Sequence, residues 1–151
     1  MPGFSSTRTI VINAPPDAIR PLLTDFEAWQ RWSPWEGLDP DLQRTYAGQG
    51  VGAHYAWSGN KKAGQGSMTM TSITPERLDV DLVFEKPFKA TNQVAFVLTP
   101  QGDGRTEVAW SMTGERNLVF AVMGKLFFDN AIRKDFDRGL AALKAEAERS
   151  R

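Results

Sequence analysis

The sequence contains no cysteine and a single histidine in its 151 residues. It therefore cannot form a disulfide, a thiolate metal site or a cysteine nucleophile, and one chain cannot supply a metal site built from several histidines. The charges balance, with 18 Lys and Arg against 18 Asp and Glu, and the isoelectric point is near 6.6. Such a neutral chain lacks the positive surface typical of nucleic-acid-binding proteins. We expect no metal, no cofactor and no nucleic-acid partner.

Long apolar runs are also missing. The most apolar stretch, residues 118–128, contains Lys125 and is shorter than the roughly 20 residues that a transmembrane helix needs. The first residues lack the basic region and apolar core of a secretory signal. We therefore expect a cytoplasmic protein without membrane insertion, either a monomer or a weak homodimer.

Aromatic residues are plentiful. They make up 11% of the chain and include five Trp and nine Phe, within an ordinary globular profile of 41% hydrophobic and 24% charged residues. The length fits one domain spanning residues 1–151. Composition alone names no reaction.

Alternating apolar and polar residues predict a sheet. The clearest case places Leu78, Val80, Leu82 and Phe84 on one face, opposite the acidic residues of the same segment. Short turns between the segments favour antiparallel pairing with one buried face. Seven strands are predicted, at residues 7–13, 42–46, 51–57, 67–74, 78–85, 92–98 and 108–112.

The rest of the pattern is helical. Two short helices are expected after the first strand, one from Pro16 or Asp17 and one over residues 25–31. A long C-terminal helix is expected from Leu118 to about Arg149. Its apolar stripe consists of Phe128, Ile132, Phe136, Leu140, Leu143 and Ala147.

These elements predict an α+β fold in which a curved, seven-stranded antiparallel sheet wraps around the long helix. Only that helix is large enough to cover the apolar face of the sheet. A straight helix cannot touch a curved sheet along its whole length. The gap between them is therefore the natural place for a ligand cavity.

Several stretches carry a family resemblance over nearly the whole chain. They are residues 26–36, 55–60, 64–68, 84–88, 108–114 and 134–140. The sequence resembles the helix-grip (SRPBCC, START-like) superfamily of lipid-binding proteins, pollen allergens and aromatic polyketide cyclases. More narrowly, it is similar to the bacterial polyketide cyclase/dehydrase-like group. The resemblance implies the helix-grip fold but brings no fixed catalytic set, so the catalytic residues stay unknown.

Inward-facing aromatic and methionine side chains are the candidate lining of the cavity. Methionine suits loosely shaped apolar pockets, and an ordinary filled core is the alternative. The candidate ligand-binding residues are Trp32, Trp35, Tyr55, Trp57, Met68, Met70, Phe84, Phe96, Trp110, Met112, Met123 and Phe127.

Three tryptophans, Trp29, Trp32 and Trp35, follow the two short helices. This segment must cross the open end of the sheet. Two interpretations remain open: a lid that closes over a ligand, or a plug that fills the end of the core. Their spacing of three residues places at least two of them on one side of a helical turn.

Polar candidates are fewer. Tyr55, Asn60 and Asn92 are possible anchors in an otherwise apolar pocket, although Asn60 also suits a hairpin turn. His54 is the usual acid–base candidate at neutral pH, but its parity places it on the face opposite Tyr55. The acidic residues lie mainly in turns or on outer faces, where they are solvated.

Three functions are compatible with these residues. The first is binding of an apolar or aromatic, lipid- or polyketide-like small molecule between the sheet and the C-terminal helix. The second is a cyclase or dehydratase that uses the same pocket, with an acid or a hydroxyl assisting proton transfer. The third is an interaction module of the co-chaperone type, related by resemblance to the domain that activates a heat-shock chaperone ATPase. A buried carboxylate in the pocket would favour the second function over the first.

Overall fold

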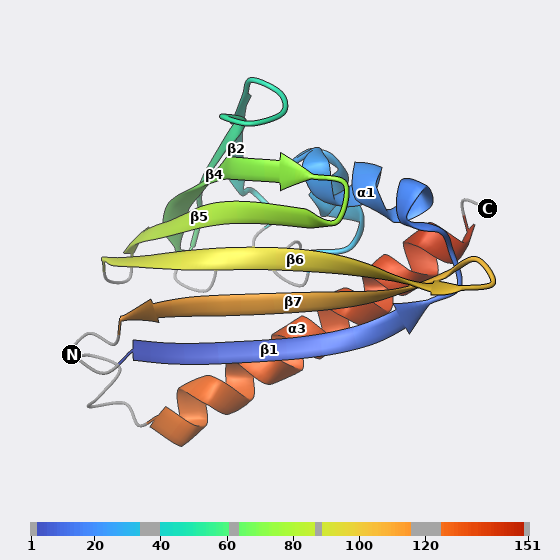
Figure 1. The fold of residues 1–151 in the computed structure, drawn as a ribbon. Helices are drawn as coiled ribbons and strands as arrows, with labels where there is room; N and C mark the ends of the chain where they lie inside the picture. Colours follow the sequence, from blue (N-terminus) through green and yellow to red (C-terminus); the bar gives the residue numbers. More distant parts are fainter. Residues whose placement is uncertain (1–2, 34–39, 61–63, 87–88, 116–124, 150–151) are drawn as a thin grey trace.

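The computed structural model describes residues 3–33, 40–60, 64–86, 89–115 and 125–149. Its strands and helices follow the expected order of one strand, two short helices, six strands and a long helix (Figure 1). The elements are β1 (Gly3–Ile12), α1 (Pro16–Thr24), the 3-10 helix η1 (Ala28–Arg31), β2 (Gln43–Ala47), β3 (His54–Ser58), β4 (Gln65–Thr74), β5 (Arg77–Lys86), β6 (Ala90–Gly102), β7 (Arg105–Glu115) and α3 (Lys125–Arg149).

The seven strands form one antiparallel sheet in the order β1-β7-β6-β5-β4-β3-β2. All strands after β1 pair with their neighbours in sequence, and β1 closes the opposite edge by pairing with β7. The α3 helix runs diagonally across β7 and β1, and its C-terminal end lies near α1 (Figure 1). The predicted helix-grip architecture is confirmed.

Alternation along β5 shows why the sheet has one buried face. Leu78, Val80 and Leu82 are buried, whereas Asp79 and Asp81 on the other face are partly open to solvent. The same period of two continues in β6, where Val94, Phe96 and Leu98 are buried. The face toward α3 is called the concave face below.

The C-terminal part of the predicted apolar stripe of α3 faces the core, whereas the side chains of Phe128 and Ile132 lie outside the described residues. Phe136, Leu140, Leu143 and Ala147 are fully buried. The expected start of this helix at Leu118 lies outside the described residues, where the helix is described from Lys125 on. No helix of the described ranges combines the length and the apolar character needed to cross a membrane.

Polar contacts fasten α3 to β1 at the edge of the sheet. Arg8 donates from Nε and Nη2 to the two carboxylate oxygens of Asp137, at 2.8 and 2.9 Å. This contact raises the pKa of Arg8 above its ordinary value, mainly through the side-chain hydrogen bond. Farther along, Lys144 donates to the carbonyl oxygen of Val11 at 3.2 Å. The helix is therefore held over the β1–β7 side of the sheet.

One strand begins later than predicted. The expectation of a strand from Val51 was wrong, because β3 starts at His54 and Val51 is 62% exposed. Gly50 and Gly52 adopt positive φ angles of 68° and 92°, which suit a turn and not an extended strand. Ala53 is still buried, so the alternation is correct from that residue on.

Candidate functional site

One half of the concave face is filled by protein side chains. The Trp110 ring stacks on Phe136 of α3 with 4.1 Å between centroids and an interplanar angle of 10°. Phe96 stacks on the same indole at 5.0 Å. Met70 and Met112 are fully buried in the same region. These five residues, four predicted ligand-binding positions on the sheet and Phe136 of the helix, thus make up a packed core.

The tryptophans after α1 fill the end of this core. Trp29 and Trp32 are 3% and 2% exposed, and their rings lie 4.8 Å apart. Each indole Nε1 donates to a carbonyl oxygen near the end of α1, Trp29 to Leu23 and Trp32 to Leu22, both at 2.8 Å. This burial and hydrogen bonding favour the plug over the lid. Trp35 lies outside the described residues.

The other half of the concave face carries a row of partly open aromatic rings. Tyr46 stacks on Tyr55 at 5.0 Å, and Tyr55 stacks on Trp57 at 5.9 Å. The rings of Trp57 and Phe84 form a T-shaped contact with their centroids 5.9 Å apart. Tyr55 is buried, but Tyr46, Trp57 and Phe84 are only half-buried although they lie on the inner side of the sheet. We call these four residues the aromatic row.

A glycine lies beneath this row. Gly66 pairs with Trp57 on one side and with Phe84 on the other. A Cβ at Gly66 would approach the Trp57 ring to 2.7 Å and the carbonyl oxygen of Val83 to 2.4 Å. The missing side chain therefore lets the Trp57 indole lie close against the backbone of β4.

Two polar side chains share the concave face with the aromatic row. Arg44 lies opposite Trp57 in the β2–β3 pair and is half-buried. Asn92 lies between Leu82 and Gly114 in the registers of β5, β6 and β7. Asn92 is 3% exposed, and within the described part of the chain its Oδ1 atom accepts no hydrogen bond. A buried polar atom without a partner typically destabilises a protein by about 1–3 kcal/mol.

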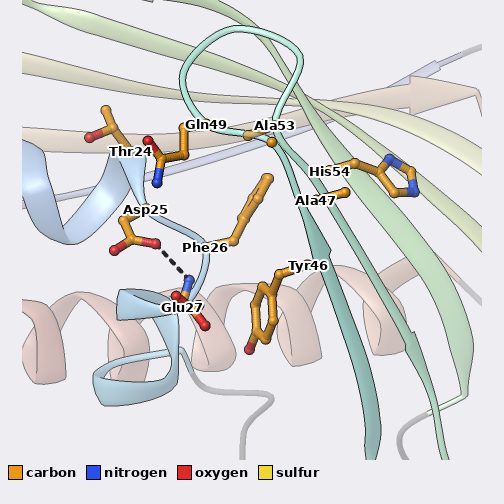
Figure 2. A pocket seen from close by; sticks show the side chains of 10 residues that line it. Thr24, Asp25, Phe26, Glu27, Tyr46, Ala47, Gln49, Ala53 and His54 are labelled. Carbon is orange, nitrogen blue, oxygen red and sulfur yellow. Dashed lines mark hydrogen bonds between the residues drawn. The ribbon is translucent and has the colours of Figure 1, made fainter.

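A pocket of about 330 Å³ lies at the rim of the fold, between the α1–η1 connection and the β2–β3 hairpin (Figure 2). Its lining residues are Thr24, Asp25, Phe26, Glu27, Tyr46, Ala47, Gly48, Gln49, Ala53 and His54. Buried Phe26 lines this rim pocket, and its ring centroid lies 5.9 Å from that of Tyr55. Tyr46 of the aromatic row also lines the pocket.

Polar groups of the rim pocket already have partners in the protein. Asp25 accepts a hydrogen bond from the backbone N–H of Glu27 at 3.0 Å, and the Tyr46 hydroxyl accepts one from Gln30 at 2.6 Å. His54 Nδ1 lies 2.9 Å from Thr69 Oγ1, and its ring is directed away from Phe26 (Figure 2). The predicted outward orientation of His54 agrees with this contact.

The predicted ligand-binding residues separate into three groups. Trp32, Met70, Phe96, Trp110 and Met112 belong to the packed half, and Tyr55, Trp57, Met68 and Phe84 belong to the half with the aromatic row. Met123 and the side chain of Phe127 lie outside the described residues, as does Trp35. None of the twelve lines the rim pocket. The cavity between sheet and helix stays a prediction.

Sequence reasoning missed Tyr46 and Arg44. Both lie on the concave face, where β2 extends the row begun by Tyr55 and Trp57. The alternation of Arg44 and Tyr46 could have indicated their shared face. The segment was predicted only as a weak strand, because it is short and most of its residues are polar. Among the residues that the structure describes, no three His, Asp or Glu side chains gather at a possible metal site.

The chain matches a known protein family. Residues 3–148 match the family described as polyketide cyclase / dehydrase and lipid transport. The chain belongs to this family. The match spans nearly the whole sequence and includes both halves of the concave face. No functionally curated protein matches the chain.

Solved structures with the same fold come from several organisms. An aromatase/cyclase from a Streptomyces species superposes with a TM-score of 0.75 at 13% identity, over 98% of this chain and 95% of the other. Norcoclaurine synthase from Thalictrum flavum, in complex with dopamine and hydroxybenzaldehyde, gives 0.74 at 9% identity, over 99% and 89%. A structural-genomics protein from Mesorhizobium loti gives 0.70 at 18% identity, over 98% and 99%. Such likenesses show a shared fold.

Proposed function

We propose that the protein binds an apolar or aromatic small molecule against the aromatic row, between the concave face and α3. The observation that carries this proposal is the contrast between the two halves of one sheet face. The half beneath Phe136 is filled by stacked protein rings, whereas Trp57, Phe84 and Tyr46 remain half-buried. Flat apolar rings that are open on one side gain free energy when a ligand covers them.

The family supports this proposal, because binding a small molecule is common to both activities in its description. One solved structure with the same fold is named an aromatase/cyclase, and another is a synthase in complex with dopamine and hydroxybenzaldehyde. We extend the class of ligand, a flat and mostly apolar molecule, from those proteins to this one as part of the proposal.

The polar groups on the concave face suit recognition of such a ligand. Arg44, Tyr46, Tyr55 and Asn92 offer hydrogen-bond donors and acceptors at fixed register positions. The acidic side chains of β5 lie on the opposite face of the sheet. Binding is therefore the better supported function, and cyclisation or dehydration on the same face is the second candidate. The cytoplasmic location and the monomeric or weakly dimeric state remain predictions.

Isothermal titration calorimetry with 2-naphthol tests the proposal. We expect saturable one-to-one binding by the wild-type protein, and about tenfold weaker binding after Trp57→Ala or Phe84→Ala because each substitution removes an apolar contact surface. Native mass spectrometry of the freshly purified protein adds a second readout, in which a co-purifying apolar molecule is expected.

Val51→Ala and Val11→Ala are the matched controls, since both valines are large exposed apolar residues away from the aromatic row. These two variants should bind 2-naphthol as the wild type does. Equal affinity of all four variants, or no heat of binding for the wild type at saturating probe, would reject a ligand site on the aromatic row.

A further inference from the structure

Asn92 is a polar residue on a face of β6 where the other inward-facing residues are apolar. It follows Ala90 and precedes Val94 and Phe96 on the inner face of β6, and its neighbours across the sheet are Leu82 and Gly114. Its side chain is almost completely removed from solvent. The outward-facing neighbour Gln93, by contrast, is exposed.

The amide oxygen of Asn92 accepts no hydrogen bond from the protein within the described residues. Buried polar atoms in folded proteins nearly always have partners, so each exception calls for an explanation. A leucine at this position would fill a similar volume and would leave no buried acceptor without a donor. Among the described residues, no donor offsets the cost of burying this amide oxygen, and a ligand could supply one.

The position of Asn92 relative to the aromatic row indicates the source of that donor. Leu82, the direct neighbour of Asn92, also pairs with Met68, which in turn pairs with Tyr55. Phe84 lies one step along β5 on the same face as Leu82. On the other side, Gly114 has no side chain to cover the amide. A ligand that lies on the aromatic row and extends toward β6 would meet the Asn92 amide beside Leu82, on a side where the β7 neighbour contributes no side chain.

We propose that Asn92 Oδ1 accepts a hydrogen bond from a hydroxyl group carried by an aromatic ligand of the concave face. This inference rests on the proposed function and narrows its ligand class to hydroxylated rings. A neutral O–H suits this position, because an acceptor on an apolar face pairs with it without the large desolvation penalty of a charged donor. The aromatic row supports the ring, and Asn92 fixes its orientation.

Two probes of nearly equal shape test the inference. 2-Naphthol carries the hydroxyl donor, and 2-methoxynaphthalene replaces that donor with a methyl ether. Titration calorimetry gives the ratio of their affinities for the wild type and for Asn92→Leu. We expect this ratio to fall about tenfold in the variant, the usual size of one neutral hydrogen bond. Gln93→Leu, one residue along and on the outer face, is the matched control and should leave the ratio unchanged.

The unfolding midpoint without ligand is a second readout. If Asn92 had a purely structural role, its replacement would lower this midpoint. If no protein group bonds Oδ1, Asn92→Leu should keep or raise the unfolding midpoint while it lowers the preference for the hydroxyl. Asn92→Ala removes the acceptor without adding bulk and serves if the leucine variant does not fold.

The outcomes of these experiments distinguish the role of Asn92 from the proposed function. An unchanged affinity ratio in both Asn92 variants, with both probes bound, would overturn this inference and leave the proposed function standing. A lowered midpoint in both variants together with an unchanged ratio would assign Asn92 a purely structural role. Failure of the wild type to bind either probe would overturn the proposed function and this inference with it.

Discussion

At the scale of single residues, the indole N–H groups of Trp29 and Trp32 explain why these tryptophans are fixed. They donate to the carbonyl oxygens of Leu23 and Leu22, which belong to the last turn of α1. Carbonyl groups in the last turn of a helix have no partner within the helix. The two side chains therefore complete the end of α1 while their rings fill the core.

Replacing Trp32 should mainly affect stability. Trp32→Ala removes a fully buried ring that lies 5.7 Å from Phe96 and 5.6 Å from Trp110, and it should lower the free energy of unfolding by about 3–5 kcal/mol. Trp32→Phe should lower it less, because a smaller aromatic ring still fills part of the site, although the hydrogen bond to Leu22 and part of the buried ring are lost. Urea denaturation measures both values.

Affinity for 2-naphthol, measured on the same samples, separates the plug from the lid. A plug predicts a large loss of stability with affinity nearly intact in the molecules that remain folded. A loss of affinity with little change in stability would instead show that Trp32 acts as a lid.

The sequence predicted the contact between these tryptophans but not their partners. A spacing of three residues brings Trp29 and Trp32 to one side of a turn, as observed. The choice between lid and plug depended on which carbonyl groups lie within reach of the indoles. That distance depends on how α1 packs against the sheet, which no local pattern encodes.

At the scale of elements, Gly66 lies where β3, β4 and β5 pack closely around the Trp57 ring. The register between β4 and β5 shifts at Gln65 and Gly66, where the Trp57 ring lies against the backbone. Gly66→Ala should lower the free energy of unfolding by about 1–3 kcal/mol, because the new methyl group meets both a ring and a backbone carbonyl. Urea denaturation of the variant and of the wild type measures this difference in unfolding free energy.

Ser67→Ala is the control for this prediction, since Ser67 is the next residue and lies on the outer face of β4. Its unfolding free energy should change by less than about 0.5 kcal/mol. A Gly66→Ala variant as stable as Ser67→Ala would show that the strand relaxes freely and that the Trp57 ring does not depend on the glycine.

The pairing of α3 with β1 through Arg8 and Asp137 should contribute little and should depend on salt. Both side chains are about half exposed, at 43% and 49%, and exposed ion pairs are screened by solvent. Asp137→Asn is expected to shift the thermal midpoint slightly at low salt and not at all in 1 M NaCl. A large shift that persists in high salt would show that the pair, and not apolar packing, fixes the helix.

The pH dependence of this contact follows from the raised pKa of Arg8. A cationic group with a raised folded-state pKa stabilises the protein at every pH below its ordinary pKa, and the effect is lost only as the pH rises through the raised value. For an arginine that range lies far above neutrality. Titration of Arg8 should therefore add no slope to the stability curve between pH 6 and 10.

Element prediction succeeded where alternation was long and failed where glycines intervene. β5 and β6 contain several inward apolar residues in strict alternation, and both strands lie where they were expected. Val51 continues the alternation of Ala53 and Tyr55 in the sequence, yet Gly50 and Gly52 turn the chain there. Periodicity does not report backbone dihedral angles, so the strand was predicted three residues too early.

At the scale of the whole molecule, the proposed function assigns stability to one half of the concave face and binding to the other. Stacked rings between β7 and α3 hold the helix against the sheet, and the plug of Trp29 and Trp32 closes one end. The aromatic row toward β2 is less completely buried, and in the proposed function this row contacts the ligand. The sequence predicted which side chains face inward, because this depends on their alternation along each strand. It did not separate the packed residues from the half-buried ones, because that difference depends on where the helix crosses the sheet.

The most direct test of a ligand site on the aromatic row is a proton NOE experiment on protein labelled with ¹³C at methionine and alanine methyl groups, with 2-naphthol as probe. Met68 lies on the concave face between Tyr55 and Leu82, whereas Ala53 lines the rim pocket. We predict intermolecular NOEs from 2-naphthol to the Met68 methyl group. NOEs to Ala53 without any to Met68, at saturating probe, would place the ligand in the rim pocket and contradict the proposed site.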